Sequence, residues 1–206
     1  MSISVFNDFW RFSEDPFKDT PDPKCFYPTL SHRQALTSMI YGIDTRSGLI
    51  SVTGEVGTGK TLLIHVLLKR IDEKARRVII FYSSITFEDL LKNILSELEV
   101  PVEGKSKESL LSQLNGYLAR IDQGETVVVI IDEAQNLPEE VLEEIGRLFA
   151  LNNSASMQLQ IIFVGQPEFE EKLNSQRLSQ LNERLKIRCP SSRRAIPETV
   201  PLRIGS

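Results

Sequence analysis

Apolar residues along this chain alternate between short aliphatic runs and longer stretches with helical spacing. The runs over residues 49–53, 127–131 and 159–164 hold few polar side chains, which is typical of strands covered on both faces. A further β-rich run spans residues 78–83, and residues 185–189 predict a last strand at a sheet edge. The pattern therefore predicts a five-stranded sheet.

Between these runs, apolar residues recur every three or four positions, which is the spacing of one helical face. Strands that alternate with helices predict a mainly parallel sheet with helices on both faces, an α/β three-layer sandwich. The stripes that predict the helices cover residues 31–41, 60–72, 90–98, 110–121 and 141–149.

Both ends of the chain depart from this alternation. The first 45 residues are rich in proline and aromatic side chains, so residues 15–28 are expected to be irregular. After Pro190 no helical or strand period remains. We therefore expect an N-terminal segment of residues 1–45 packed on a core of residues 46–189, followed by a mobile tail of residues 190–206.

Composition changes this picture little. The chain has 206 residues, of which 41% are hydrophobic and 25% charged, as expected for one globular domain. Its net charge of −4 gives no general electrostatic reason to bind nucleic acid, although it says nothing of local basic patches. The first residues have no basic segment, and no apolar stretch approaches the roughly 18 residues of a membrane span. We expect a cytoplasmic protein whose thiols, Cys25 and Cys189, are reduced.

The strongest chemical signal follows the first predicted strand. Glycines there allow backbone conformations that turn successive N–H groups toward phosphate oxygens, and the next helix adds its positive N-terminus. Lys60 is expected to reach the β- and γ-phosphates, and the Thr61 hydroxyl to bind Mg²⁺. The complete phosphate-loop motif, Walker A, is Gly54, Glu55, Val56, Gly57, Thr58, Gly59, Lys60 and Thr61.

A second signal lies where the run over residues 127–131 ends in two acidic residues. A carboxylate at the carboxyl end of a buried parallel strand lies where such sheets bind ligands. Asp132 suits the Walker B role, in which it holds Mg²⁺ through water. Glu133 can polarise the water that attacks the γ-phosphate. On its own this pair could also be a solvated strand end.

Weaker signals come from one glutamine and three arginines. Gln166 follows the strand over residues 159–164 and could sense the γ-phosphate or orient water, although a simple turn residue before proline is an equal alternative. Phosphoryl transfer often needs an arginine from a neighbouring subunit. Arg184 is the first candidate, with Arg177 and Arg188 next. The chain lacks a guanine-reading segment, which disfavours a GTPase, and small-molecule kinase chemistry stays as a weaker alternative.

With these residues in hand, the chain resembles the AAA+ ATPases of the general secretion pathway protein A type, a group that includes MSHA pilus biogenesis ATPases. The resemblance covers roughly residues 6–189. It rests on the motifs Asp15-Pro16-Phe17, Thr20-Pro21-Asp22-Pro23, Ser31-His32-Arg33, Tyr41-Gly42-Ile43, the phosphate loop, Ile131-Asp132-Glu133-Ala134-Gln135-Asn136-Leu137 and Val164-Gly165-Gln166-Pro167-Glu168.

The resemblance implies a P-loop NTPase fold and an ATPase that uses ATP and Mg²⁺. Gln166 would be the sensor and Arg184 the finger that reaches a neighbour's nucleotide in a homo-oligomeric ring. Partners would be envelope secretion or pilus assembly proteins, which could hold the protein at the inner membrane. The adenine pocket would be lined by Tyr27, Pro28, His32 and Tyr41–Ile43, including Tyr41 and Ile43 themselves.

The sequence departs from that family plan after Cys189. A helical lid is expected there, together with a second sensor arginine, but the chain continues with a short tail containing proline and arginine. Without the lid, ring formation and turnover are open. Three functions therefore remain: an ATPase for secretion or pilus assembly, a DNA-transaction ATPase of the transposition type, which the acidic balance disfavours, and a nucleotide-binding module with little turnover.

Overall fold

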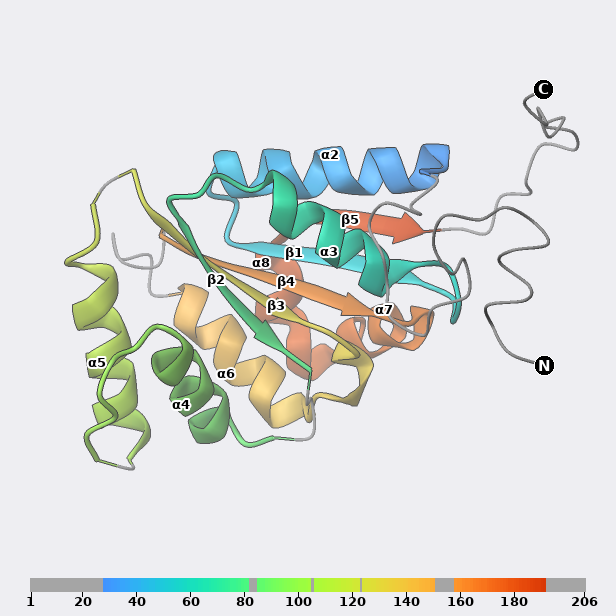
Figure 1. Ribbon diagram of the computed structural model, residues 1–206. Helices are drawn as coiled ribbons and strands as arrows, with labels where there is room; N and C mark the ends of the chain where they lie inside the picture. Colours follow the sequence, from blue (N-terminus) through green and yellow to red (C-terminus); the bar gives the residue numbers. More distant parts are fainter. Residues whose placement is uncertain (1–27, 82–84, 105, 123, 151–157, 192–206) are drawn as a thin grey trace, which may run out of the picture.

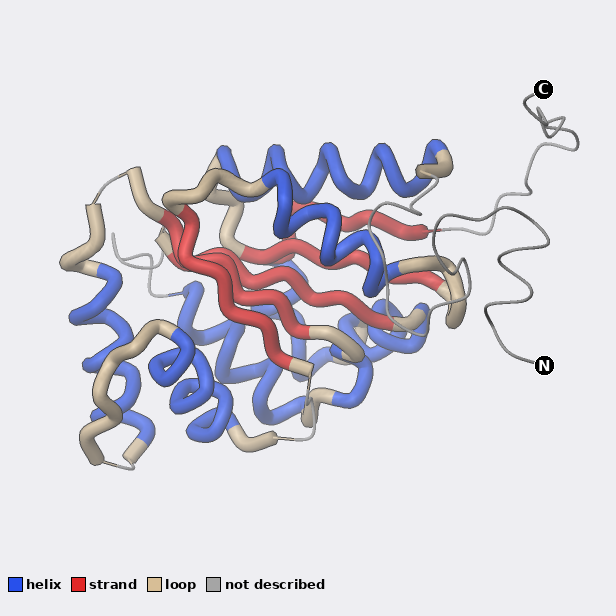
Figure 2. The backbone as a smooth tube through the Cα atoms, in the orientation of Figure 1, coloured by secondary structure: helices blue, strands red, loops and turns tan. Residues whose placement is uncertain are grey.

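In the computed structural model, residues 28–81, 85–104, 106–122, 124–150 and 158–191 are described, and they form a sheet between two layers of helices (Figures 1 and 2). The expectations for residues 15–27 and for the tail after residue 191 lie outside the described residues. The elements are α2 (Leu30–Asp44), β1 (Leu49–Gly54), α3 (Lys60–Arg70), β2 (Ala75–Ile80), α4 (Phe87–Glu97), α5 (Lys107–Leu118), β3 (Thr126–Ile131), the 3₁₀ turn η2 (Ala134–Asn136), α6 (Glu139–Ala150), β4 (Leu159–Gly165), α7 (Pro167–Leu173), the 3₁₀ turn η3 (Gln176–Leu178), α8 (Ser179–Arg184) and β5 (Leu185–Ser191).

The sheet confirms the predicted α/β architecture. Its strands are ordered β2-β3-β4-β1-β5, and each neighbouring pair is parallel. Every residue of β1, β3 and β4 is buried, as their aliphatic runs predict. Because all five strands point the same way, their carboxyl ends meet at one edge of the sheet. This is the edge where open parallel sheets bind ligands.

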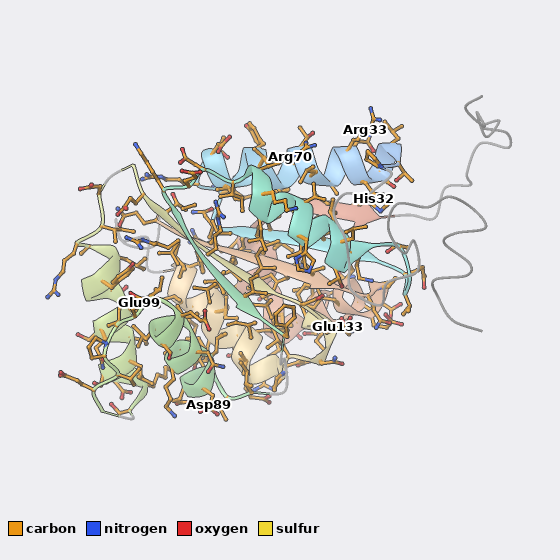
Figure 3. All side chains as sticks on the ribbon, in the orientation of Figure 1. His32, Arg33, Arg70, Asp89, Glu99 and Glu133 are labelled. Carbon is orange, nitrogen blue, oxygen red and sulfur yellow. The ribbon has the colours of Figure 1, made fainter. Side chains whose placement is uncertain are left out.

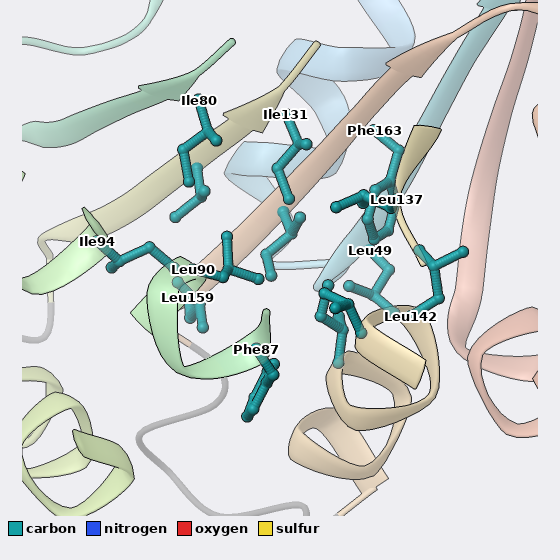
Figure 4. Close-up of a cluster of buried hydrophobic side chains, with 14 of the residues drawn as sticks. Leu49, Ile80, Phe87, Leu90, Ile94, Ile131, Leu137, Leu142, Leu159 and Phe163 are labelled. Carbon is teal, nitrogen blue, oxygen red and sulfur yellow. The ribbon is translucent and has the colours of Figure 1, made fainter. Parts of the chain in front are cut away.

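Two apolar clusters hold the layers together. On one face α2 and α3 pack against the sheet, and on the other face lie α4, α6, α7 and α8, with α5 against α4 (Figure 1). Figure 4 draws side chains of the larger cluster, among them Phe87 and Leu90 of α4 and Ile131 and Phe163 of the strands. The helices thus fix the sheet from both sides and leave its carboxyl edge to the connecting loops.

Helix α2 and strand β2 both begin earlier than predicted. Helix α2 begins at Leu30, one residue before the predicted start at Ser31, because Thr29 caps it. The Thr29 hydroxyl accepts a hydrogen bond from the His32 N–H, and the Thr29 N–H donates one to the His32 ring. Strand β2 begins at Ala75, three residues before the predicted start. The prediction missed this start because Arg76 and Arg77 are exposed and interrupt the apolar run of an edge strand.

The last strand continues further than predicted. β5 runs to Ser191, two residues beyond the expected end of the core at residue 189, and it pairs with β1 so that Ser191 lies opposite Gly54. The end of β5 therefore lies beside the loop that follows β1. Cys189 on β5 is buried, as expected of a reduced thiol in the core, and burial raises its pKa.

A glycine lets α2 approach the sheet closely. A Cβ atom on Gly42 would lie 2.6 Å from Ile50 Cδ1 and 2.7 Å from Ile187 Cδ1, closer than real Cβ atoms come. The helix therefore packs closely against β1 and β5 at Gly42, and its amino end lies at the carboxyl edge of the sheet.

Candidate active site

The phosphate-loop motif connects β1 to α3 at the carboxyl edge of the sheet. Gly59 caps α3 with φ 80° and ψ 22°, and Gly57 has φ 77°. Residues with a Cβ atom are strained in this left-handed region, so the glycine spacing of the motif has a direct structural reason. The loop places its N–H groups at the amino end of an eleven-residue helix, which is favourable for an anion.

Lys60 is folded back over this loop. Its side chain is 8% exposed, and Nζ donates hydrogen bonds to the carbonyls of Gly54 at 2.7 Å and Glu55 at 3.0 Å. Within the described ranges, no carboxylate lies within 4.0 Å of this ammonium. A buried cation held only by neutral carbonyls fits a site for phosphate oxygens.

Asp132 follows β3 at the same edge and is 5% exposed. Its Oδ1 accepts the Glu133 N–H at 2.9 Å, and its Oδ2 accepts the Thr61 hydroxyl at 3.4 Å. Burial raises the pKa of this carboxyl, although the hydrogen bonds from Glu133 and Thr61 and the charge of Lys60 act in the opposite direction. A hydroxyl and a desolvated carboxylate side by side are hard oxygen ligands, and they fit Mg²⁺.

Glu133 adopts a backbone conformation that is rare for a residue with a side chain. Its φ of 53° and ψ of 42° are left-handed, which costs on the order of 1 kcal/mol and is typical of functional sites. Its Oε2 accepts hydrogen bonds from Gln135 Nε2 at 2.5 Å and from Gln166 Nε2 at 3.3 Å. The structure therefore brings Gln166, at the end of β4, to the acidic pair at the end of β3.

The structure does not bring Tyr41 and Ile43 to the phosphate loop. They lie nine and eleven residues after His32 in α2, about 14 and 17 Å further along the helix at 1.5 Å per residue. Tyr41 is 62% exposed, and Ile43 is buried in the core beneath the helix. Tyr41 and Ile43 therefore lie away from the phosphate loop, which differs from the expectation for the adenine pocket. The expectation for Tyr27 lies outside the described residues.

His32 does reach the loop. Its Nε2 lies 2.6 Å from the Thr58 carbonyl, which can only accept, so Nε2 donates and Nδ1 is left to accept from Thr29. His32 and Glu133 lie toward the same end of the sheet, and Glu99 lies at the other end (Figure 3). Among the expected adenine-pocket residues that the structure describes, His32 contacts the phosphate loop directly, through the carbonyl of Thr58.

The three candidate arginines have different surroundings. Arg177 pairs with Glu140 at 2.9 Å and Glu143 at 3.1 Å, and Arg188 pairs with Glu170 at 2.5 Å. Both are thus engaged by carboxylates of their own chain.

Arg184 ends α8 where β5 begins, next to the start of β1 in the sheet. A six-residue strand separates it from the phosphate loop, about 20 Å. Arg184 therefore lies far from the phosphate loop of its own chain.

Sequence reasoning gave no role to two residues that shape this site. Gln135 lies in the quoted motif after Glu133, but nothing in the spacing shows which group its amide reaches. Lys172 of α7 donates to the carbonyls of Gln135 at 2.6 Å and Leu137 at 2.9 Å. Neither contact could be found without knowing how α7 packs beside η2.

A comparison with protein families matches residues 43–173 to the AAA domain family AAA_22. The chain belongs to this family. The match begins within α2, spans the phosphate loop and the acidic pair, and ends with α7, so it includes Lys60, Asp132, Glu133 and Gln166. Within the described part of this AAA domain, no helix is long and apolar enough to cross a bilayer.

Two curated proteins are similar to this AAA domain in sequence. General secretion pathway protein A of Aeromonas hydrophila is 35% identical over 186 residues, which are 89% of this chain and 34% of that protein. A protein named as a candidate ORC1-type DNA replication protein 1 of Thermoplasma acidophilum is 28% identical over 127 residues, covering 58% of this chain and 35% of that one. The chain thus spans about a third of the length of both relatives.

Among solved structures, the AAA domain is similar to Cdc6p from Pyrobaculum aerophilum. The TM-score is 0.60 at 20% identity, over 89% of this chain and 48% of that chain. A likeness at this identity shows the fold alone. It confirms the P-loop NTPase architecture that the strand and helix pattern predicts.

Proposed function

We propose that this AAA domain binds ATP with Mg²⁺ and hydrolyses it to ADP and phosphate, and that this ATPase activity drives assembly of an envelope secretion or pilus system. One observation carries the chemical part of the proposal. The ends of three strands bring the phosphate loop, the Asp132–Glu133 pair and Gln166 together at one edge of the sheet.

Each of these groups has chemistry that suits one part of the reaction. Lys60 supplies positive charge for the β- and γ-phosphates, and its neutral partners can be exchanged for phosphate oxygens. Thr61 and Asp132 hold Mg²⁺, which supplies charge neutralisation on the phosphates. Glu133 orients and polarises the attacking water, and Gln166, whose amide donates to Glu133, acts as the sensor of the γ-phosphate.

The secretion role is supported by the likeness to general secretion pathway protein A, which covers most of this chain. On this view the domain works in the cytoplasm, at the inner membrane through partner proteins, and as a homo-oligomer. Arg184 is far from its own phosphate loop, so as a finger it would serve the nucleotide of a neighbouring copy.

The test is steady-state ATP hydrolysis by the purified chain, titrated over protein concentration. We expect turnover that requires Mg²⁺ and rises in specific activity with concentration. Glu133→Gln should keep ATP binding and lose hydrolysis at least 100-fold, since only the charge that polarises water is removed. Lys60→Ala should weaken ATP binding itself. Binding without turnover at any concentration would instead identify a module that only binds nucleotide.

The likeness to a DNA replication protein of Thermoplasma acidophilum favours DNA transactions as a second candidate. The net charge of −4 does not support it. The discriminating measurement is turnover with and without duplex DNA at low salt. Stimulation by DNA that salt abolishes would replace the secretion role with this one.

A further inference from the structure

The side chain of Gln135 bridges two parts of the site that different strands provide. Its Nε2 donates to Glu133 Oε2 at 2.5 Å, and its Oε1 accepts the backbone N–H of Gln166 at 3.1 Å. Both ends of the carboxamide are therefore used, one on the acidic turn after β3 and the other on the start of α7 after β4. A carboxamide bound at both ends has a fixed orientation.

This bridge also orients the Glu133 carboxylate. The amides of Gln135 and Gln166 both donate to Oε2. From the described residues no hydrogen bond reaches Oε1 of Glu133. The two amides thus restrain the position of Oε2, and Oε1 is the oxygen of this carboxylate that is left for a water molecule.

The surroundings are shaped to keep Gln135 in this place. A Cβ atom on Gly165 would lie 2.9 Å from Gln135 Oε1, so the glycine at the end of β4 leaves room for the amide. Lys172 holds the backbone of the same turn by donating to the carbonyls of Gln135 and Leu137. Side chain and backbone of Gln135 are therefore both tied to the β4–α7 segment.

We propose that Gln135 is a positioning residue for hydrolysis. Its carboxamide holds the Glu133 carboxylate in the orientation that presents Oε1 to the attacking water, and it couples that orientation to the backbone of Gln166. This inference rests on the proposed ATP hydrolysis. It assigns Gln135 no contact with ATP, so its effect should fall on turnover and spare nucleotide binding.

The first test compares Gln135→Met with the wild-type chain. Methionine keeps the length of the side chain and removes both amide contacts. We expect kcat for ATP hydrolysis to fall 10- to 100-fold, the range that a small misplacement of a catalytic group produces. The Kd for ATP, measured with the non-hydrolysing Glu133→Gln background, and the denaturation midpoint should stay within about twofold and 2 °C of the parent.

A second variant leaves Gln135 in the sequence and displaces it. Gly165→Ala puts a methyl group 2.9 Å from Gln135 Oε1, so the carboxamide at the far end of this side chain has to move and lose its contact with Gln166. The same methyl group comes within 3.3 Å of Phe169 Cβ, so the denaturation midpoint is measured as well. We expect a fall in kcat in the same direction as for Gln135→Met, and no further fall when the two changes are combined. Asn93→Ala, which removes an exposed amide on α4, is the matched control and should hydrolyse ATP like the wild type.

The outcomes separate this inference from the function on which it rests. A wild-type chain without turnover overturns the proposed ATPase, and the positioning role with it. A wild-type chain with turnover and a Gln135→Met variant of equal kcat overturns the positioning role alone. A variant that loses ATP affinity or stability in proportion to kcat shows that Gln135 supports the fold or the nucleotide, and this also overturns it.

Discussion

At the scale of single residues, Asp132 illustrates how the site carries an electrostatic cost before any cation binds. Burial raises the pKa of this carboxyl above its ordinary value of 3.8. The folded chain therefore holds the Asp132 proton more tightly than the unfolded chain does. The contribution of Asp132 to stability is most favourable below pH 3.8 and is lost as the pH rises through the raised pKa.

Asp132→Asn should therefore stabilise the nucleotide-free protein at pH 7, because the amide has no charge to desolvate. The difference from the wild type should shrink as the pH is lowered toward 4. Urea denaturation at several pH values measures both effects. With ATP and Mg²⁺ present the order should reverse, since the wild-type carboxylate then has a cation. A variant less stable than the wild type at pH 7 would contradict this account.

Residue roles differ in how far the sequence reveals them. Roles for Lys60 and Thr61 can be predicted because the phosphate loop is a local structure whose spacing encodes its shape. The bridge made by Gln135 depends on a left-handed turn at Glu133 and on the packing of α7, and a linear pattern contains neither. Tyr41 and Ile43 were placed by family resemblance, which carries no information on how far along a helix they lie.

At the scale of elements, the closeness of α2 to the sheet is set by Gly42. Gly42→Ala should destabilise the protein by about 1–3 kcal/mol, because the new methyl group meets Ile50 and Ile187 in a filled interface. Gly116→Ala in α5 is the matched control, since no atom lies within 4 Å of its new Cβ. That change should stabilise by up to about 1 kcal/mol through helix propensity.

Chemical denaturation of both variants gives the comparison. Equal behaviour of the two alanines would show that the helix can shift away from the sheet without cost. In that case the contact between His32 and Thr58 would also be expected to loosen, because both depend on where α2 lies.

The pattern of apolar runs was sufficient to find all five strands and the helices α2 to α6, but it did not predict the short helices α7 and α8 between β4 and β5. It also missed the start of β2, where the exposed polar side chains of Arg76 and Arg77 belong to an edge strand. Strand order is not written in any single run. The order of the strands depends on how the parallel crossovers connect them, and this order determines which loops lie side by side at the carboxyl edge of the sheet.

At the scale of the whole molecule, the separation of Arg184 from its own phosphate loop predicts complementation between copies. Chains carrying Arg184→Ala retain Glu133, and chains carrying Glu133→Gln retain the arginine. Each variant should be inactive alone. Mixtures should regain a measurable fraction of wild-type hydrolysis, at interfaces where Glu133 comes from one variant and Arg184 from the other. Arg33→Ala, which removes an exposed arginine of α2 and keeps both Arg184 and Glu133, is the control and should hydrolyse ATP on its own like the wild type. Mixtures that stay inactive would remove the finger role from Arg184.

The pairing of β5 with β1 has a consequence for how such domains grow. Although β5 is the last strand of the described residues, it ends opposite Gly54, so the polypeptide returns to the place where the phosphate loop begins. Any module joined just after this strand in a longer protein therefore starts beside the phosphate loop and needs no long connector to reach it. A domain added at that junction during evolution could therefore respond to the state of the phosphate loop without a long linker.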